Sequence, residues 1–229
     1  MSAGTIKDIS KRIVKAGRKL YNNGLVKGTS GNISARVPGT QMFLIKSSGS
    51  QMETFRAEEL VLVDLQGNKI DGKSKVSLET PMHASIYRIR KDVQAVVHTH
   101  APTATAFGIV KTEILPLQIE MFMFLPNGVP VIPFKPPGSR ELASEVQKKI
   151  VNYDAVVLEN HGIVTVGSTI ETACDLNEMV EEGAKLQLWA IMLGGRKMMD
   201  LSYLKEKFRT NSTVEQEKKQ QGFQSNDGS

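Results

Sequence analysis

Hydrophobic positions along the chain alternate between helix-like and strand-like spacing, with glycine-rich and polar turns between the stretches. Over residues 5–22 the apolar side chains recur every three or four positions, which predicts an amphipathic helix that ends before Gly24. Short, largely apolar runs then predict strands, because each run is bounded by turn residues. These runs cover 32–37, 42–46 and 60–65, and a hairpin turn is predicted at 66–68.

The rest of the chain continues this mixture of helical and strand-like stretches. Pro102 suits the first turn of a helix, and Ser139 is a suitable N-cap. A polar segment rich in Gln, Lys and Ser predicts disorder over 209–229, which leaves one α/β domain over 1–208. The predicted elements are, in chain order, a helix over 79–91, a strand over 95–100, a helix from Pro102, a strand over 129–133, a helix over 139–151, strands over 155–158 and 163–166, and a helix over 168–193.

Composition is that of a soluble globular protein, with 40% hydrophobic and 23% charged residues among 229. No apolar run reaches the length of a membrane span, and the first residues lack the apolar core of a secretory signal. The single cysteine, Cys174, excludes an intrachain disulfide and is interpreted as a small hydrophobic residue within a helix. These features predict a cytoplasmic protein.

The chain is basic, with a net charge of +5 and an isoelectric point near 9.2. Its lysines and arginines are scattered, with only short clusters such as Lys11-Arg12 and Lys148-Lys149, and no aromatic stacking motif or zinc finger accompanies them. A solvated surface is therefore the first interpretation, an anionic small molecule the second, and nucleic acid a distant third.

Three of the four histidines have a pattern that suits a metal site. His98 and His100 are two residues apart in a predicted strand, so their side chains project from the same face. Metal ligation and hydrogen-bonded core histidines are equally good interpretations of that pair alone. His161 occupies a turn that follows another predicted strand, and catalytic zinc commonly takes three protein ligands. The three together favour a metal centre.

Glu79 precedes a predicted helix whose first turn contains Pro81. One interpretation is a carboxylate stabilised by the helix dipole. The other is a carboxylate that ligates the metal at rest and transfers a proton in turnover. His83 lies one helical turn later, and we interpret it as a packing residue or a support for the ligands.

Two loops of small residues, over 28–32 and 47–50, could let backbone N–H groups converge on an anion. Each is a weak signal by itself, because loops are rich in Gly and Ser. Neither of the common nucleotide-binding glycine motifs is present, so a nucleotide enzyme is unsupported. Two anion loops beside one metal site indicate a small phosphorylated substrate.

Four segments of the chain form a recognisable set. They are Gly-Thr-Ser-Gly-Asn-Ile-Ser at 28–34, Ser-Leu-Glu-Thr-Pro-Met-His at 77–83, Ala-Val-Val-His-Thr-His at 95–100 and Glu-Asn-His-Gly at 159–162. In order and separation they resemble the class II aldolase/adducin family over about residues 5–200, and the reaction type that the chain most resembles within it is that of L-fuculose-1-phosphate aldolases.

The resemblance implies a three-layer α/β/α sandwich around a largely antiparallel sheet, and a homotetramer with active sites at its subunit interfaces. It implies that His98, His100 and His161 bind zinc, with Mn²⁺, Fe²⁺ or Co²⁺ as other possible ions. Glu79 then carries the catalytic carboxylate. The implied reaction is reversible cleavage of a ketose 1-phosphate to dihydroxyacetone phosphate and an aldehyde through a metal-stabilised enediolate. The residues implied for binding the substrate phosphate are Thr29, Asn32, Ser48, Gly49 and Ser77.

The chain departs from the aldolase pattern at three places. Leu78 stands where the family often has a serine, which removes one hydroxyl from the expected phosphate site. The segment 117–122 lacks the tyrosine of the fuculose-type enzymes. Asn211 aligns with their C-terminal tyrosine, although Tyr203 is nearby. These departures leave the metal chemistry intact and the aldehyde partner open.

Other functions remain as alternatives. Within the family these are a pentulose-phosphate 4-epimerase, a methylthioribulose-phosphate dehydratase and a sugar-acid phosphate decarboxylase, although the epimerases tend to have aspartate where this chain has Glu79. A non-catalytic module like the adducin head is a more remote alternative, because such modules lack the metal-binding set. Nucleic-acid binding has only the basic charge in its favour.

Overall fold

The computed structural model describes residues 3–195, 202–203 and 206. The chain divides into two compact units, Met1–Met192 and Leu193–Ser229, and the first unit contains the sheet and the helices that carry the candidate site. The predicted domain boundary at 208 and the predicted disorder of 209–229 concern residues outside the described part. In that part, no helix combines the length and apolar character that a membrane span requires.

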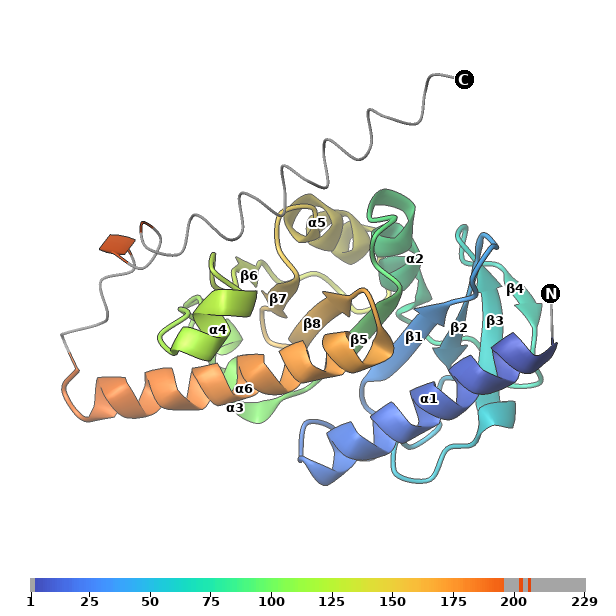
Figure 1. The fold of residues 1–229 in the computed structure, drawn as a ribbon, viewed down its shortest axis with the longest axis horizontal. Coiled ribbons are helices and arrows are strands. Elements are labelled where there is room, and N and C mark those ends of the chain that lie inside the picture. The colour runs from blue at the N-terminus through green and yellow to red at the C-terminus, as the bar shows by residue number, and fades with distance from the viewer. Residues whose placement is uncertain (1–2, 196–201, 204–205, 207–229) are drawn as a thin grey trace, which may run out of the picture. The chain divides into compact units, whose positions relative to one another are not determined.

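One sheet of eight strands forms the centre of the first unit, in the order β4-β3-β2-β1-β5-β8-β7-β6 (Figure 1). Neighbouring strands are antiparallel except β6 and β7, which are parallel. The predicted α/β fold with a largely antiparallel sheet is therefore confirmed. The strands are β1 Asn32–Arg36, β2 Met42–Lys46, β3 Leu60–Asp64, β4 Lys69–Asp71, β5 Ala95–Thr99, β6 Val131–Ile132, β7 Ala155–Leu158 and β8 Gly162–Gly167.

Within residues 3–195, six α-helices and a short 3-10 helix, η1, accompany the sheet. Local sequence explains several of their ends. The hydroxyl of Ser139 accepts a hydrogen bond from the backbone N–H of Leu142 at 3.0 Å, as its predicted N-cap role requires. Pro81 and Pro102 lie in the first turns of their helices, as expected. The helices are α1 Ala3–Asn22, η1 Ala57–Glu59, α2 Thr80–Ile89, α3 Pro102–Ile109, α4 Ile119–Phe124, α5 Arg140–Ile150 and α6 Ile170–Met192.

Buried side chains form two hydrophobic clusters, one for each face of the sheet. Along β5, Ala95 and Val97 belong to one cluster and Val96 to the other, because successive strand residues face opposite sides. Helices α1, α3, α4 and α6 contribute to the first cluster, and α2 and α5 to the second (Figure 1). Cys174 is buried on α6 in the first cluster, as its interpretation as a small hydrophobic residue predicts.

Most predicted elements are present with ends shifted by one or two residues. Helices η1 and α4 were not predicted: η1 has three residues, and the six mostly apolar residues of α4 are too short to show a helical period. Met121 of α4 is buried against Gly183 of α6, so tertiary packing stabilises α4. The predicted strand over 129–133 is reduced to Val131–Ile132, and Val129 instead forms an isolated bridge with Ile114.

Strand order also places the candidate site. Strand β5 lies between β1 and β8, with His98 opposite Asn32 on one side and Val164 on the other. Thr99 pairs with Ile163, so the end of β5 lies beside the beginning of β8. The turn between β7 and β8 contains His161 and is therefore held next to His98 and His100.

Candidate metal centre and active site

Three imidazole rings converge at the end of β5 and the turn before β8. The ring centroids of His98, His100 and His161 are 4.7–5.1 Å apart. One nitrogen from each ring can be chosen so that all three lie within 4.8 Å of one another. The structure thus brings together the three histidines that the sequence singled out.

Backbone conformation in the β7–β8 turn allows this approach. Asn160 has a positive φ of 55°, a conformation that asparagine tolerates better than most residues. A Cβ atom added at Gly162 would lie 3.1 Å from Cδ2 of His100 and 3.2 Å from Cε1 of His98, and closer still to the carbonyl oxygen of Thr99. Only glycine fits at this position without moving the rings or the strand.

Hydrogen bonding fixes the orientation of His98. Its Nδ1 donates to the carbonyl oxygen of Ile163 at 2.9 Å, so the lone pair of the neutral ring is on Nε2 and faces the cluster. Burial lowers the pKa of His98 to about 3, although the carboxylate of Glu79 acts in the opposite direction. Burial also lowers the pKa of His100. Neutral imidazole is the form that binds metals.

Glu79 completes the cluster. It is the N-cap residue of α2 and is 7% exposed. Its Oε2 lies 3.0 Å from Nε2 of His98, and its Oε1 lies 3.3 Å from Nε2 of His161. The carboxylate therefore faces two of the three rings.

These distances test whether the residues fit a divalent cation. Nε2 of neutral His98 and the carboxylate oxygen both present lone pairs, and two lone pairs at 3.0 Å repel unless a cation lies close to both. In the described part of the chain, Oε1 of Glu79 is buried without a hydrogen-bond partner. Nε2 of His98 and Nε2 of His100 are 3.2 Å apart, close to the spacing of about 3.3 Å for two ligands of a tetrahedral zinc with bonds of about 2.0 Å. The donor set fits a divalent ion.

The ionisation of Glu79 is consistent with that fit. Burial acts to raise the pKa of its carboxyl group. Positive charge at the rings of His98 and His161, which a bound cation would supply when the rings are neutral, and a hydrogen bond from Asn32 outweigh burial, so the pKa is lowered. The carboxylate is therefore charged at neutral pH.

A chain of hydrogen bonds supports Glu79 from the interior. Nδ2 of Asn32 donates to Oε2 of Glu79 at 2.8 Å, and Oδ1 of Asn32 accepts from Nε2 of His83. Nδ1 of His83 then accepts from the hydroxyl of Ser34 at 2.7 Å, and that hydroxyl oxygen accepts from Tyr87 at 2.8 Å. Every donor in this chain has one acceptor. His83 is fully buried and supports Asn32, which agrees with its interpretation as a supporting residue.

The expected phosphate-binding residues lie on three segments that hydrogen bonds connect. The backbone N–H of Ser48 donates to the carbonyl oxygen of Lys75 at 3.0 Å, and Nδ2 of Asn32 donates to Glu79, so the segments around Ser48 and Asn32 are both joined to the segment before α2. Within that last segment the hydroxyl of Ser77 accepts from the N–H of Glu79 at 3.3 Å. Thr29, Ser48 and Gly49 are exposed and Ser77 is half-buried, whereas Asn32 is buried with both ends of its amide bonded.

Lys46 is a residue near this region that the sequence reasoning missed. It is 2% exposed at the end of β2, and its Nζ donates to the carbonyl oxygens of Thr29 and Gly31, each at 3.2 Å. No carboxylate in the described part forms an ion pair with it, and burial lowers its pKa to about 8, although the charge of Glu59 acts in the opposite direction. Its signal in the sequence is a lysine that ends an otherwise apolar strand just before the 47–50 loop.

Comparisons with known proteins agree with this site. The family model of the class II aldolase and adducin N-terminal domain matches residues 11–188. The chain is 31% identical to 5-deoxy-D-ribulose 1-phosphate aldolase of Bacillus thuringiensis serovar kurstaki over 86% of this chain and 94% of that protein. It is 32% identical to 3-oxo-tetronate 4-phosphate decarboxylase of Haemophilus influenzae over 76% of this chain and 84% of that protein.

A solved structure is similar in fold as well. The structure of an L-fuculose 1-phosphate aldolase superposes with a TM-score of 0.81 at 29% identity, over 88% of this chain and 96% of that one. The family match and the aldolases among these proteins confirm the prediction of an enzyme of the aldolase-type lyase class. The chain belongs to the class II aldolase and adducin N-terminal domain family.

Proposed function

We propose that this enzyme reversibly cleaves a ketose 1-phosphate of the L-fuculose 1-phosphate type into dihydroxyacetone phosphate and an aldehyde. The observation that carries the proposal is the convergence of His98, His100 and His161 on one point beside the buried carboxylate of Glu79. Zinc is the first choice of ion, because three imidazoles that leave an open position are a usual catalytic zinc site.

The roles of the residues follow from their positions. The three histidines would hold a divalent ion, which would supply Lewis-acid chemistry to stabilise the negative charge that carbon–carbon cleavage leaves. Glu79 is the acid and base for the carbon next to the carbonyl group. In cleavage its carboxylate takes up the proton that the hydroxyl group loses as the carbon–carbon bond breaks, and gives that proton to this carbon. The reverse reaction runs the same two transfers backwards, so no proton is gained or lost. Oε1 is the oxygen for this task, because Oε2 is held by Asn32.

The substrate phosphate is proposed to bind at Thr29, Asn32, Ser48, Gly49 and Ser77. The hydrogen bonds Ser48–Lys75 and Asn32–Glu79, which join the three segments carrying these residues, support the assignment. The buried ammonium of Lys46 supports it further, because a cation without a carboxylate partner favours an anion nearby.

The assembly and layering are part of the same proposal. A homotetramer in the cytoplasm with interfacial active sites is expected, and exposed apolar side chains offer a surface for it. They include Met123 and Phe124 on α4 and Trp189 and Met192 near the end of α6. Hydrophobic clusters on both faces of the sheet support the three-layer α/β/α sandwich.

A decarboxylase acting on a sugar-acid phosphate is the second candidate. Two observations favour it: the similarity to the Haemophilus influenzae decarboxylase, and the absence of tyrosine from the segment 117–122. Decarboxylation also leaves an enediolate, so the same histidines and carboxylate could serve either reaction.

Activity on a panel of phosphorylated substrates tests the proposal. The metal-loaded protein is assayed for triose phosphate release, coupled to NADH oxidation, and in parallel for carbon dioxide release. Triose phosphate from a ketose 1-phosphate supports the aldolase. Carbon dioxide from a 3-oxo sugar-acid phosphate, without triose phosphate from any ketose, would replace it with the decarboxylase.

A further inference from the structure

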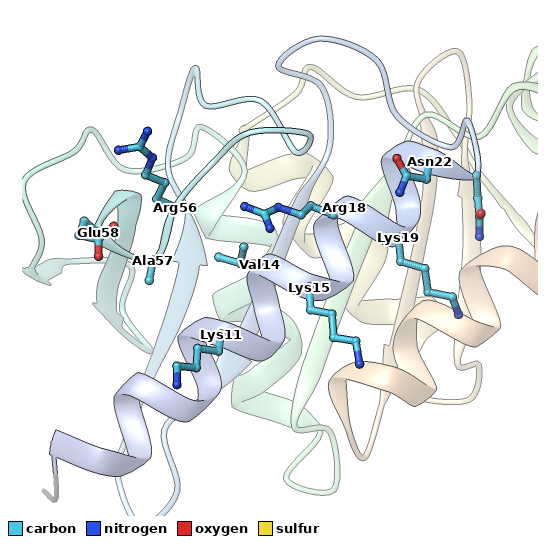
Figure 2. A pocket seen from close by; sticks show the side chains of 10 residues that line it. Lys11, Val14, Lys15, Arg18, Lys19, Asn22, Arg56, Ala57 and Glu58 are labelled. Carbon is cyan, nitrogen blue, oxygen red and sulfur yellow. The ribbon is translucent and has the colours of Figure 1, made fainter.

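A groove of about 710 Å³ lies between α1 and the segment around η1, away from the residues of the imidazole cluster. Side chains from both elements line it, and Figure 2 shows Arg18 of α1 and Arg56 next to η1 on its two sides. It shares no lining residue with the site described above. The lining is Lys11, Val14, Lys15, Arg18, Lys19, Asn22, Asn23, Arg56, Ala57 and Glu58.

The charges in this groove are unbalanced. Lys19 is compensated, because its Nζ lies 2.8 Å from Oδ1 of Asp175 and 2.9 Å from Oε1 of Glu178 on α6. The remaining cations are Lys11, Lys15, Arg18 and Arg56, all exposed, and none of the four has an ion pair within the described residues. Glu58 is the one acidic side chain among the lining residues.

The arrangement differs on the two sides of α1. Toward α6, Arg12 pairs with Glu171 at 2.5 Å, and Lys19 pairs with two carboxylates. In the groove, by contrast, Arg18 extends toward Arg56 (Figure 2), and the four cations without an ion pair share the lining with one carboxylate, Glu58. Because like charges held together repel one another, the groove favours an anionic ligand.

The spacing and chemistry of the lining indicate the kind of anion. Lys11 and Arg18 are seven residues apart on one helix, which is about 10 Å along its axis. One phosphate cannot reach both ends of such a row, whereas a chain of phosphates can. The groove has the volume of a small-molecule site, and its lining includes no aromatic side chain on which a base could stack.

We propose that this groove binds a small molecule that carries two or more phosphate groups. Arg18 and Arg56 bind it from opposite walls of the groove. Each guanidinium group can donate two parallel hydrogen bonds to the oxygens of one phosphate group. Lys11 and Lys15 add charge along α1. This site is independent of the aldolase reaction, whose proposed substrate carries one phosphate.

Lysine footprinting by mass spectrometry tests the proposal with site resolution. The full-length protein is acetylated at fixed ionic strength with and without inorganic tripolyphosphate, and modification rates are measured for each lysine. Lys11 and Lys15 are expected to react about tenfold more slowly once the ligand exceeds its dissociation constant by about ten times. Lys91 and Lys149, exposed lysines outside the groove, serve as internal controls and should react at unchanged rates. Orthophosphate at equal ionic strength should protect much less.

A pair of matched variants completes the experiment. Arg18→Gln/Arg56→Gln should abolish the protection of Lys11 and Lys15. Lys91→Gln/Lys149→Gln, which changes the net charge equally, should retain the protection of Lys11 and Lys15.

Unchanged rates in the wild type, equal protection of all lysines, or protection that survives the arginine substitutions would overturn the proposal. Stronger protection by a single-stranded oligonucleotide at equal phosphate concentration would also overturn it, in favour of nucleic acid. Aldol cleavage by the arginine variant should remain at the wild-type level, so this test and that of the aldolase can fail separately.

Discussion

The imidazole cluster and the cationic groove beside α1 differ in the groups they bring together and in how firmly those groups are held. The cluster gathers lone pairs in a buried position, where hydrogen bonds to Ile163 and Asn32 fix His98 and Glu79. The groove gathers exposed cations, of which Lys11, Lys15, Arg18 and Arg56 have no ion pair in the described part of the chain. A buried side chain that hydrogen bonds hold in place contributes a large binding free energy by itself. An exposed charge contributes little, so several exposed charges must act together to bind a ligand. Substitutions should therefore have large effects in the cluster and small, salt-dependent effects in the groove.

Replacing a ligand histidine should have the largest effect. His98→Ala removes a donor that the protein holds in position by a hydrogen bond, so we expect loss of stoichiometric metal and of detectable activity. Metal content and turnover are measured on the same preparation. His83→Gln is the matched control, because His83 supports Asn32 and does not face the cluster; it should retain the metal. If His98→Ala kept both metal and activity, the expectation that substitutions in the imidazole cluster have larger effects than those in the groove would be wrong.

Glu79→Gln should come next. The amide preserves the shape of the side chain but cannot carry the proton, so kcat should fall by about 10²–10⁴-fold while the protein stays folded. Steady-state kinetics and a thermal melt measure the two properties. Glu159→Gln, at a carboxylate that pairs with Lys111 and accepts from the N–H of Phe134, is the control and should leave turnover close to the wild type. Near-normal turnover in Glu79→Gln would remove Glu79 from the mechanism.

Asn32→Ala separates two roles of one residue. If Asn32 mainly positions Glu79, kcat should fall by about 10–100-fold with little change in KM, as for other supports of metal-site residues. If it mainly binds the substrate phosphate, KM should rise instead. Ser34→Ala, two bonds further along the same chain, should have a smaller effect on kcat. An equal or larger loss of kcat in Ser34→Ala would indicate that the hydrogen-bond chain maintains the local structure and does not specifically position Glu79.

The dependence of stability on pH should show the smallest effect. Burial lowers the pKa of His83 to about 4 in the folded protein, against about 6.5 when unfolded. The unfolded state therefore binds more protons between these values, and the free energy of unfolding should fall as the pH is lowered from about 6.5 to about 4. The slope from this one residue is at most about 1.4 kcal/mol per pH unit. Denaturant melts at several pH values should give a shallower slope for His83→Gln, and equal slopes would contradict the burial argument.

The sequence predicted the elements of the site better than their arrangement. Strand period placed His98 and His100 on one face, and His161 was recognised in its turn. In the structure His100 lies one residue beyond β5, and it still meets the cluster because β5 pairs with β8. That pairing joins residues far apart in the chain, so no local pattern could reveal it.

Asn32 shows the same limit. The loop that contains it suggested an anion-binding residue, whereas the structure adds hydrogen bonds to Glu79 and His83. These bonds depend on the register of β1 with β5, which sets Asn32 opposite His98. The expected phosphate role of Asn32 stays a prediction, which the kinetics of Asn32→Ala address.

Basic residues of the groove were visible in the sequence but were interpreted as scattered. Lys11, Lys15 and Arg18 are four and three residues apart, a helical spacing that places them on one face of α1. Arg56 joins them only because the segment before η1 packs on α1, where the ring of Phe55 lies against Gly17. The groove could not be predicted from the positions of the charges in the sequence, because it forms only when these two distant segments pack together.

Metal coordination tests the central claim most directly. X-ray absorption at the edge of the metal bound to the purified, metal-replete protein reports the atoms in the first coordination shell and their distances. We expect one divalent ion per chain with three imidazole nitrogens at about 2.0–2.1 Å, and loss of that signal in His161→Ala. A chain that binds no stoichiometric ion, or an ion whose ligands include no imidazole, would contradict the assignment of His98, His100 and His161.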